Sequence, residues 1–342
     1  MITFSAVFLG VSVVALHQTS FNSWKQGGSK KRPFSRGEPA DVKIYPLFCI
    51  AALCALFSTL VQAHLAAGEE LTVVYTSGSS GKLNACSCPG DPYGGLAERV
   101  TLLKQFRQKE KNALLLDGGN MVSLFGDFDD RAACVMRLMN LMGYAAAGVG
   151  RQELFNNIRG ALTMSRVAKF PFLSASIERN GESKPVFQPC VIVKIGRISV
   201  GITSVADSSC YFPEINRNFD YQPLPWETAL SSVLKEMEGK TDFIIVLSQM
   251  ENSSSEDLLR RFPSVDLLIQ GFSNRELKEP KRISRGFFVA PGDRGQFVGV
   301  IRMEKTPGGA LGLKKSELIP VLDIKEDKKA MDIIKEYYRK RK

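Results

Sequence analysis

The sequence predicts an α/β fold in which helices cover mixed β-sheets. Three observations support this prediction. From Leu71 onward, short runs rich in β-branched and aliphatic residues alternate with stretches whose apolar residues recur at helical spacing. Near the end of the chain, such runs follow one another without a helix between them, which is typical of antiparallel strands. The chain has 342 residues, 44% of them hydrophobic, which is enough for one large core.

The first part of this domain is predicted to alternate strands with helices. Strands are expected at residues 71–75, 113–116, 145–149 and 170–176. Helices are expected at residues 95–109 and 129–142, and a further one after Gly150. In the first helix Leu96, Val100 and Leu103 would share a face. In the second, Met136, Met139 and Met142 are interpreted as core residues rather than a copper site.

The second part is predicted to begin with a hairpin that turns at Gly196, between strands 190–195 and 198–203. Helices are then expected at residues 226–238 and 255–261, and strands at 243–247, 265–269, 286–290, 296–303 and 316–322. A last helix, 330–338, would place Ala330, Ile333, Ile334 and Tyr337 on one face. That apolar face predicts a helix that docks on the domain.

The N-terminus has the features of an export signal. Residues 1–41 form an uncertain extension, and residues 42–67 are predicted to be a signal peptide or an anchor. The apolar run 47–61 follows Lys43, precedes the small-residue sequence Val61-Gln62-Ala63, and falls short of the about 20 residues that a membrane span needs. Translation starting near Val42 would explain the extension. We expect a protein exported to the periplasm or envelope of a bacterium, in contact with membrane only if this segment is uncleaved.

The net charge of +10 is unevenly distributed. Residues 1–67 hold six Lys and Arg against two Asp and Glu, and the chain ends on four basic residues. The central domain, 68–325, has no basic stripe interleaved with aromatic residues, so no nucleic-acid partner is expected. The C-terminal segment 326–342 is predicted to be a basic helix whose end, with the four basic residues, is solvated.

Five of the seven cysteines follow the signal-like segment: Cys86, Cys88, Cys134, Cys190 and Cys210. An odd number in an oxidising compartment leaves at least one unpaired or intermolecular. Their spacing does not match a haem attachment site or a tetrahedral zinc site. The cysteine loop Cys86-Ser87-Cys88 is either one end of a disulfide that fixes a surface loop or half of a metal site.

Five polar loops follow predicted strands: Ser77–Lys82, Asp117–Asn120, Gly150–Glu153, Ser248–Glu251 and Gly271–Asn274. In α/β sheets, ligands bind at the carboxyl ends of the strands. We therefore expect these loops to converge on one rim and to form a site.

The loops and their neighbouring motifs resemble the metallophosphoesterase (calcineurin-like) superfamily, in its 5′-nucleotidase-type branch. The resemblance runs from about Leu71 to Met303 and rests on segments in family order: Tyr75–Gly81, Gly94–Arg99, Leu115–Asn120, Gly150–Glu153, Pro171–Ala175 and Gly271–Asn274. Exported relatives carry a similar Cys-x-Cys before the Gly-Gly motif. The resemblance implies a four-layer α/β/β/α sandwich of mixed sheets and a hydrolase that uses two divalent metals.

The sequence departs from that family at the positions where the resemblance places metal ligands, which are Gly78, Ser80, Asn120, Arg151, Gln152, Gln249, Phe272 and Asn274. No histidine follows His64. Neutral amides are weak ligands, and Arg151 is a permanent cation that would repel a metal. We expect no metal and no other cofactor, and an inactive rather than an active enzyme.

The expected function is a non-catalytic module that binds an anion or another protein. Ser79, Ser80, Lys82 and Arg151 are the candidate anion-binding residues, with phosphate or a phosphorylated compound as ligand and an envelope protein as a further partner. Two alternatives stay open. The Asn and Gln side chains could simply hydrogen-bond to one another and maintain the fold, or the chain could be an active phosphoester hydrolase with an unorthodox site and a metal pair.

Overall fold

The computed structural model describes residues 69–85, 92–123, 128–155, 157–182, 184–208, 221–273, 275–306 and 310–341. All of them lie in one compact unit, Ala63–Lys342. Among these residues, no helix combines the length and the apolar character that crossing a membrane requires.

The first sheet has six strands in the order β14-β13-β1-β2-β3-β4. Its parallel part consists of β1 (Glu70–Thr76), β2 (Leu114–Asp117), β3 (Ala146–Gly148) and β4 (Phe172–Leu173). Its antiparallel part consists of β13 (Phe297–Lys305) and β14 (Leu311–Pro320). Because β1, β2 and β3 run in parallel, the loops that follow them leave the sheet at the same edge.

The second sheet also has six strands, in the order β11-β12-β10-β9-β7-β6. They are β6 (Cys190–Ile195), β7 (Ile198–Ala206), β9 (Phe243–Gln249), β10 (Leu267–Gln270), β11 (Lys281–Ile283) and β12 (Gly286–Val289). The four central strands are parallel, and β6 and β11 are antiparallel at the edges. A small separate sheet pairs β5 (Ile177–Arg179) with β8 (Tyr221–Pro223).

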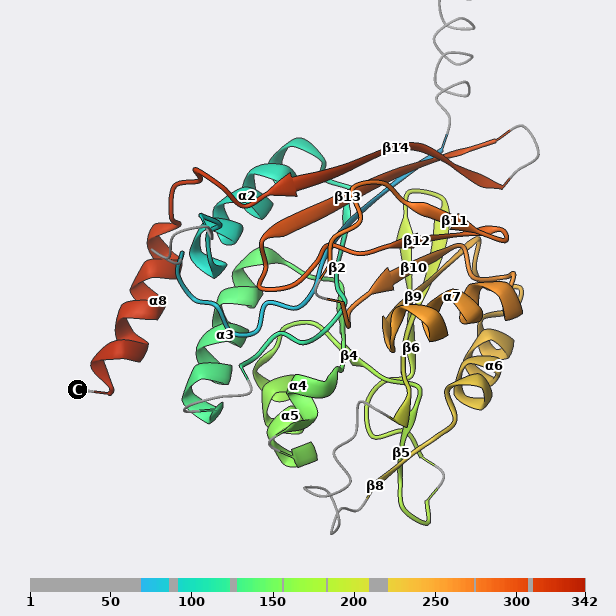
Figure 1. The fold of residues 1–342 in the computed structure, drawn as a ribbon, viewed down its shortest axis with the longest axis horizontal. Coiled ribbons are helices and arrows are strands. Elements are labelled where there is room, and N and C mark those ends of the chain that lie inside the picture. The colour runs from blue at the N-terminus through green and yellow to red at the C-terminus, as the bar shows by residue number, and fades with distance from the viewer. Residues whose placement is uncertain are drawn as a thin grey trace, which may run out of the picture. The chain divides into compact units, whose positions relative to one another are not determined.

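The two large sheets pack face to face, with helices on both outer faces (Figure 1). Between them lies a core of aliphatic side chains such as Val73, Leu116, Ile245 and Ile269, all fully buried. The first sheet is covered by α2 (Leu96–Lys109), α3 (Phe128–Met142), α4 (Arg151–Phe155), α5 (Asn157–Val167) and α8 (Lys328–Arg339). The second is covered by α6 (Trp226–Met237) and α7 (Asn252–Arg261). The predicted α/β/β/α sandwich is confirmed.

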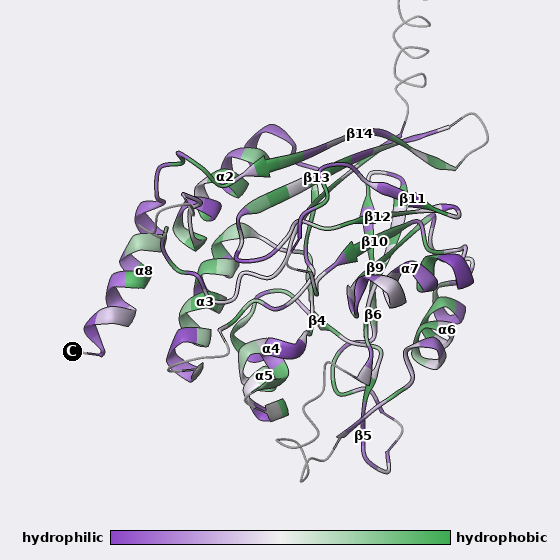
Figure 2. Cartoon of the chain, in the orientation of Figure 1, coloured by the Kyte–Doolittle hydropathy of each residue, from purple (hydrophilic) through white to green (hydrophobic). Residues whose placement is uncertain are grey.

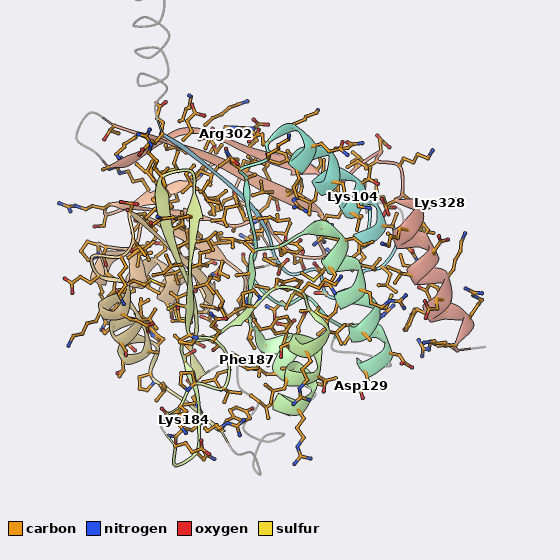
Figure 3. All side chains as sticks on the ribbon, turned by 180° about the vertical axis from the view of Figure 1, so that it is seen from behind. Lys104, Asp129, Lys184, Phe187, Arg302 and Lys328 are labelled. Carbon is orange, nitrogen blue, oxygen red and sulfur yellow. The ribbon has the colours of Figure 1, made fainter. Side chains whose placement is uncertain are left out.

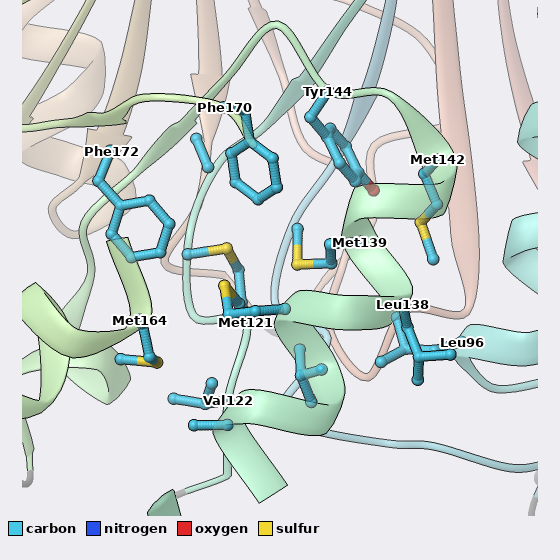
Figure 4. Close-up of a cluster of buried hydrophobic side chains, with 14 of the residues drawn as sticks. Leu96, Met121, Val122, Leu138, Met139, Met142, Tyr144, Met164, Phe170 and Phe172 are labelled. Carbon is cyan, nitrogen blue, oxygen red and sulfur yellow. The ribbon is translucent and has the colours of Figure 1, made fainter. Parts of the chain in front are cut away.

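The methionine-rich face of α3 is part of this core, as the sequence predicted. Met136, Met139 and Met142 are fully buried, and Figure 4 shows two of them beside Tyr144 and Phe170. Burying a methionine side chain stabilises the fold by about 1.5–3 kcal/mol.

The last helix docks on the domain through the face that the sequence indicated. Ala330, Ile333, Ile334 and Tyr337 are buried, and α8 alternates hydrophilic and hydrophobic residues along its length (Figure 2). The Asp327 side chain caps the helix by accepting from the Ala330 N–H at 3.0 Å. Asp327 also forms an ion pair with Lys104 of α2 at 2.7 Å. Lys104 is labelled in Figure 3.

Several elements differ from the expectation. Strand β14 begins at Leu311 rather than at residue 316, because its first half is an exposed edge with Lys314 and Lys315 and so lacks an apolar pattern. Helix α7 begins at Asn252, before its first apolar residue. The three-residue strands β5, β8 and β11 were not predicted, since so few residues show no periodicity.

Candidate functional site

The five polar loops meet at one cleft of about 560 Å³. The described residues that line it are Gly78, Ser80, Asn120, Gln152, Glu251, Asn252, Ser253, Gly271, Phe272, Ser273 and Asp293. Each of the five loops contributes at least one of them. The predicted convergence of the loops on one rim is therefore confirmed, and it follows from the parallel strands of the two sheets.

A buried amide side chain is hydrogen-bonded to Asn120, which lines this cleft. Gln249, at the end of β9, is fully buried, and its Nε2 donates to the Gly118 carbonyl. Glycines wall its niche: a Cβ on Gly150 would collide with its Oε1, and one on Gly271 would collide with its Nε2. A side chain at either position would thus displace the amide.

Asn120 connects Gln249 to two other loops. Its Nδ2 donates to Gln249 Oε1 at 2.9 Å and to the Gly271 carbonyl at 3.1 Å, while its Oδ1 accepts from the Gln152 N–H at 3.0 Å. In the amide orientation that satisfies both its oxygen and its nitrogen, Gln152 donates to the carbonyls of Val122 and Asn120 and accepts from Ser80 Oγ at 3.0 Å; in the opposite orientation its Nε2 donates to Ser80 Oγ at the same distance. The amides of three loops thus form one hydrogen-bonded network.

The first loop holds an unusual backbone and uses its N–H groups internally. Gly78 and Ser80 have φ of 58° and 47°, in the left-handed region that non-glycine residues rarely adopt. The N–H groups of Gly78, Ser80 and Gly81 donate to the carbonyls of residues 119, 120 and 121, and that of Lys82 donates to Ser79. These four N–H groups are therefore hydrogen-bonded within the protein and do not point to a ligand.

Two buried carboxylates lie behind the loops. Asp117 accepts from Thr76 Oγ1 at 2.6 Å and from the Gly119 N–H at 2.8 Å. Glu153 accepts the N–H groups of residues 120, 121 and 150 at 2.7–3.0 Å. Burial raises the pKa of Asp117 to about 6 and that of Glu153 to about 7, while these hydrogen bonds act in the opposite direction.

A buried cation near these carboxylates is Arg99, which sequence reasoning did not assign a role. It is fully buried, its Nη1 donates to Ser79 Oγ at 2.6 Å, and its charge acts to lower the pKa of Asp117. Its Nε and Nη2 have no hydrogen-bond partner among the described residues. A Cβ on Gly295 would occupy the place of the guanidinium. The Gly94–Arg99 motif was visible in the sequence, but nothing in it indicated that the arginine is buried.

The described residues do not fit a pair of divalent cations. The amide oxygens of Asn120 and Gln249 both accept hydrogen bonds from the protein, and Asp117 and Glu153 are buried among donors. Gly78 and Phe272 have no side-chain atom that could coordinate a metal. Within the part of the chain that the structure describes, no three His, Cys, Asp or Glu side chains form a group that could hold a metal ion. Such a pair needs several anionic or imidazole ligands.

The candidate anion-binding residues lie in different places. Ser80 lines the cleft. Ser79 is fully buried beneath it against Arg99, and Lys82 donates to the Tyr93 carbonyl at 3.1 Å. Arg151 is half-buried at the start of α4, and it is not among the described residues that line the cleft. Binding of phosphate stays a prediction.

Asn274, Cys86, Cys88 and Cys210 lie outside the described residues, as do the N-terminal extension and the predicted signal segment. Of the described cysteines, Cys134 is buried and Cys190 is half-buried, and both are free thiols. The role of the cysteine loop therefore stays a prediction.

Six lining residues were missed by sequence reasoning or given no role: Glu251, Asn252, Ser253, Gly271, Ser273 and Asp293. Glu251 belonged to an expected loop, and the next two residues form the first turn of α7. Asp293 follows β12, a strand not assigned to the rim. The sequence Pro-Gly-Asp at 291–293 indicates a turn, but only the tertiary structure brings it to Gly78.

The chain is similar to several known proteins, although no family model matches it. The 5′-nucleotidase of Mus musculus is 28% identical over 294 residues, which cover 77% of this chain and 48% of that protein. The chain spans about half the length of the curated relatives it matches.

Solved structures agree with the fold. A 5′-nucleotidase precursor from Thermus thermophilus superposes with a TM-score of 0.69 at 23% identity, covering 80% of this chain and 59% of that one. The calcineurin-like phosphoesterase YfkN of Bacillus subtilis superposes with a TM-score of 0.65 at 16% identity, covering 80% of this chain and 98% of that one.

Proposed function

The chain is related to the 5′-nucleotidases and has the fold of the calcineurin-like phosphoesterases, and from this premise we propose that it is a non-catalytic binding module. Its cleft lies where the resemblance places a metal pair. The single observation that supports the proposal is the network of Asn120, Gln152 and Gln249, whose amide groups are hydrogen-bonded to one another and to the backbone of the surrounding loops. Carboxylate or imidazole side chains at these positions would need a bound metal to hold them close together. The hydrogen-bonded amides need none.

The same network accounts for the preserved fold. In a metal site, closely spaced anionic ligands repel one another until the cations neutralise them. Neutral amides carry no such repulsion, so the five loops can stay together without a cofactor. A cleft that keeps its shape without metal is suited to binding a ligand and not to activating water.

We propose that the module works outside the cytoplasm. The sequence Lys43 to Ala63 has the order of a secretory signal, and a solved structure of the same fold is described as a precursor. Cell fractionation tests this part, and a protein recovered only from the cytoplasm would contradict it. N-terminal sequencing of the mature protein tests the start near Val42, which a mature chain that still contains residue 20 would contradict.

The test of the main proposal is hydrolysis of a generic phosphoester by the purified protein in the presence of Mn²⁺. We expect no turnover above that of an Asn120→Ala variant. Turnover by the wild type that is lost in Asn120→Ala would contradict the proposal and favour an active phosphoester hydrolase with an unorthodox site. A thermal melt of both proteins checks that each is folded.

A further inference from the structure

The second sheet ends in an apolar strand that pairs on one side only. β6 is the last strand in the order of this sheet, and of the described strands it pairs with β7 alone. Val191, Ile192 and Val193 make its centre apolar, and the side chain of Ile192 is 44% exposed. β-branched residues favour strand pairing, and an exposed apolar edge can pair with a strand of another chain.

The backbone groups of β6 point alternately to β7 and outward. The turn at 196–197 has two residues, and the pair that flanks such a turn, Ile195 and Ile198, exchanges hydrogen bonds. The register on β7 continues from there to Cys190 without a shift. Residues 195, 193 and 191 therefore direct their N–H and C=O groups to β7, while residues 190, 192 and 194 direct theirs outward.

Only the segment just before the strand uses its outer edge. The carbonyl of Gln188 points away from β7 and accepts from the Ser174 N–H at 3.1 Å, which agrees with the alternation. The structure gives the outward backbone groups of residues 190, 192 and 194 no hydrogen bond among the residues that it describes. The open edge therefore extends over residues 190–194.

The long edge strand of the first sheet, β14, differs from β6 in this respect. It carries the exposed Lys314 and Lys315, its register on β13 is shifted by a bulge, and it ends on Pro320. Lysines, bulges and prolines at an edge all hinder the addition of another strand. β6 has one lysine, Lys194, and neither a bulge nor a proline. The other edge strands, β4 and β11, have two and three residues and are too short to pair stably.

The sequence of β6 is complementary to itself in antiparallel pairing. We propose that two copies of this chain join their second sheets through β6, about a two-fold axis at Ile192. In this register Ile192 lies opposite Ile192 of the second copy, Val191 lies opposite Val193, and Lys194 lies opposite Cys190. All outward backbone groups of residues 190, 192 and 194 are then paired. This inference goes beyond the proposed function and does not depend on it.

Charge and the local fold favour this register over its neighbours. A slip by one residue would bring inward-facing backbone groups to the interface. A slip by two residues in one direction places Lys194 opposite Ile192, and a further slip places two lysines opposite each other. A slip in the other direction brings Lys194 opposite Gln188, whose carbonyl already accepts from Ser174. In the proposed register the second copy turns away at Gly196 beside Gln188, so the two do not compete.

The interface is small, and this sets the expected affinity. Standard stable interfaces have about 20–30 residues on each side, whereas the open edge here extends over residues 190–194. Strand pairing of this extent predicts a weak, reversible dimer with a dissociation constant of about 10–100 µM.

Sedimentation velocity of the full chain from about 1 to 500 µM measures this association, and a non-reducing gel checks that no disulfide links the copies. Ile192→Pro should weaken the dimer at least about tenfold, because it removes the outward N–H of residue 192 and leaves the bonds to β7 intact. Ser316→Pro on β14 is the matched control. Val321, five residues later, donates its N–H to the Gln296 carbonyl, so the N–H of Ser316 also points outward. This control should leave the dimer unchanged.

Exchanging the charge at position 192 tests the register itself. Ile192→Lys and Ile192→Glu should each weaken the dimer about tenfold, because like charges meet at the axis, while a mixture of the two should associate about tenfold more tightly than either alone. Because the Ile192 side chain is exposed, both should melt like the wild type.

A wild type that stays monomeric up to about 500 µM would overturn the inference. A dimer that Ile192→Pro and the charge variants leave unchanged, or that Ser316→Pro weakens as much as Ile192→Pro does, would overturn it too. A mixture of the Lys and Glu variants that associates no better than either alone would refute the two-fold axis at Ile192. Each of these results would leave the metal-free binding module standing, since metal-dependent turnover decides that proposal.

Discussion

Replacing Gln249 by alanine should destabilise the protein far more than replacing a surface glutamine. Gln249 is fully buried, accepts from Asn120 Nδ2 at 2.9 Å and donates to the Gly118 carbonyl. Losing these two hydrogen bonds costs about 1 kcal/mol each, and leaving the Gly118 carbonyl without this donor adds about 1–3 kcal/mol.

The niche would also stay open. Its walls include Gly150 and Gly271, which have no side chains that could relax into the space. Asn120 keeps its bond to the Gly271 carbonyl at 3.1 Å, which limits the loss on that side. Together these terms predict that Gln249→Ala lowers the free energy of unfolding by about 3–5 kcal/mol.

The assay is urea unfolding followed by circular dichroism, with Gln222→Ala as the control. Gln222 lies exposed on β8, so its replacement should change the free energy of unfolding by less than about 0.5 kcal/mol. If Gln249→Ala cost no more than Gln222→Ala, the amide network could not be what holds the loops of the cleft together.

Three further predictions concern the buried groups. Burial raises the pKa of Glu153 from 4.5 to about 7, so the folded state keeps a proton that the unfolded state releases, and stability should fall as the pH rises from about 4.5 to 7. Each pKa unit is worth roughly 1.4 kcal/mol. Between pH 4.5 and 7, the free energy of unfolding of Glu153→Gln should therefore rise relative to that of the wild type by up to about 3 kcal/mol. Urea unfolding at each pH measures this difference, and a difference that does not change with pH would refute the prediction. Gly271→Ala should destabilise by about 1–3 kcal/mol, because its Cβ collides with Gln249, and an unchanged free energy of unfolding would contradict this. Ile334→Ala should cost about 2–5 kcal/mol in the same assay if α8 is part of the core, and a loss under about 1 kcal/mol would show that it is not.

The sequence was most informative where apolar periodicity is strong. The pattern at 71–75 gave β1 almost to its ends, and the apolar face at 330–338 gave α8 and its docking surface. The rim of the site was predictable as well, because loops that follow parallel strands must share an edge of the sheet.

The details of the site depended on contacts between distant parts of the chain. Nothing near Asp293 in the sequence indicates that it packs against Gly78, more than 200 residues earlier. Likewise, the burial of Arg99 depends on Gly295, whose missing side chain leaves room for the guanidinium. The motif that contains Arg99 did not indicate that this arginine is fully buried or that its charge acts on Asp117.

The stoichiometry of Mn²⁺ binding tests the central claim most directly. The purified mature protein is dialysed against Mn²⁺ at neutral pH, and bound metal is measured by atomic absorption alongside an Asn120→Ala control. The amide-lined cleft predicts no stoichiometric metal in either protein. Two manganese ions per chain in the wild type, lost in Asn120→Ala, would show that the cleft is a functioning metal site and would contradict the account.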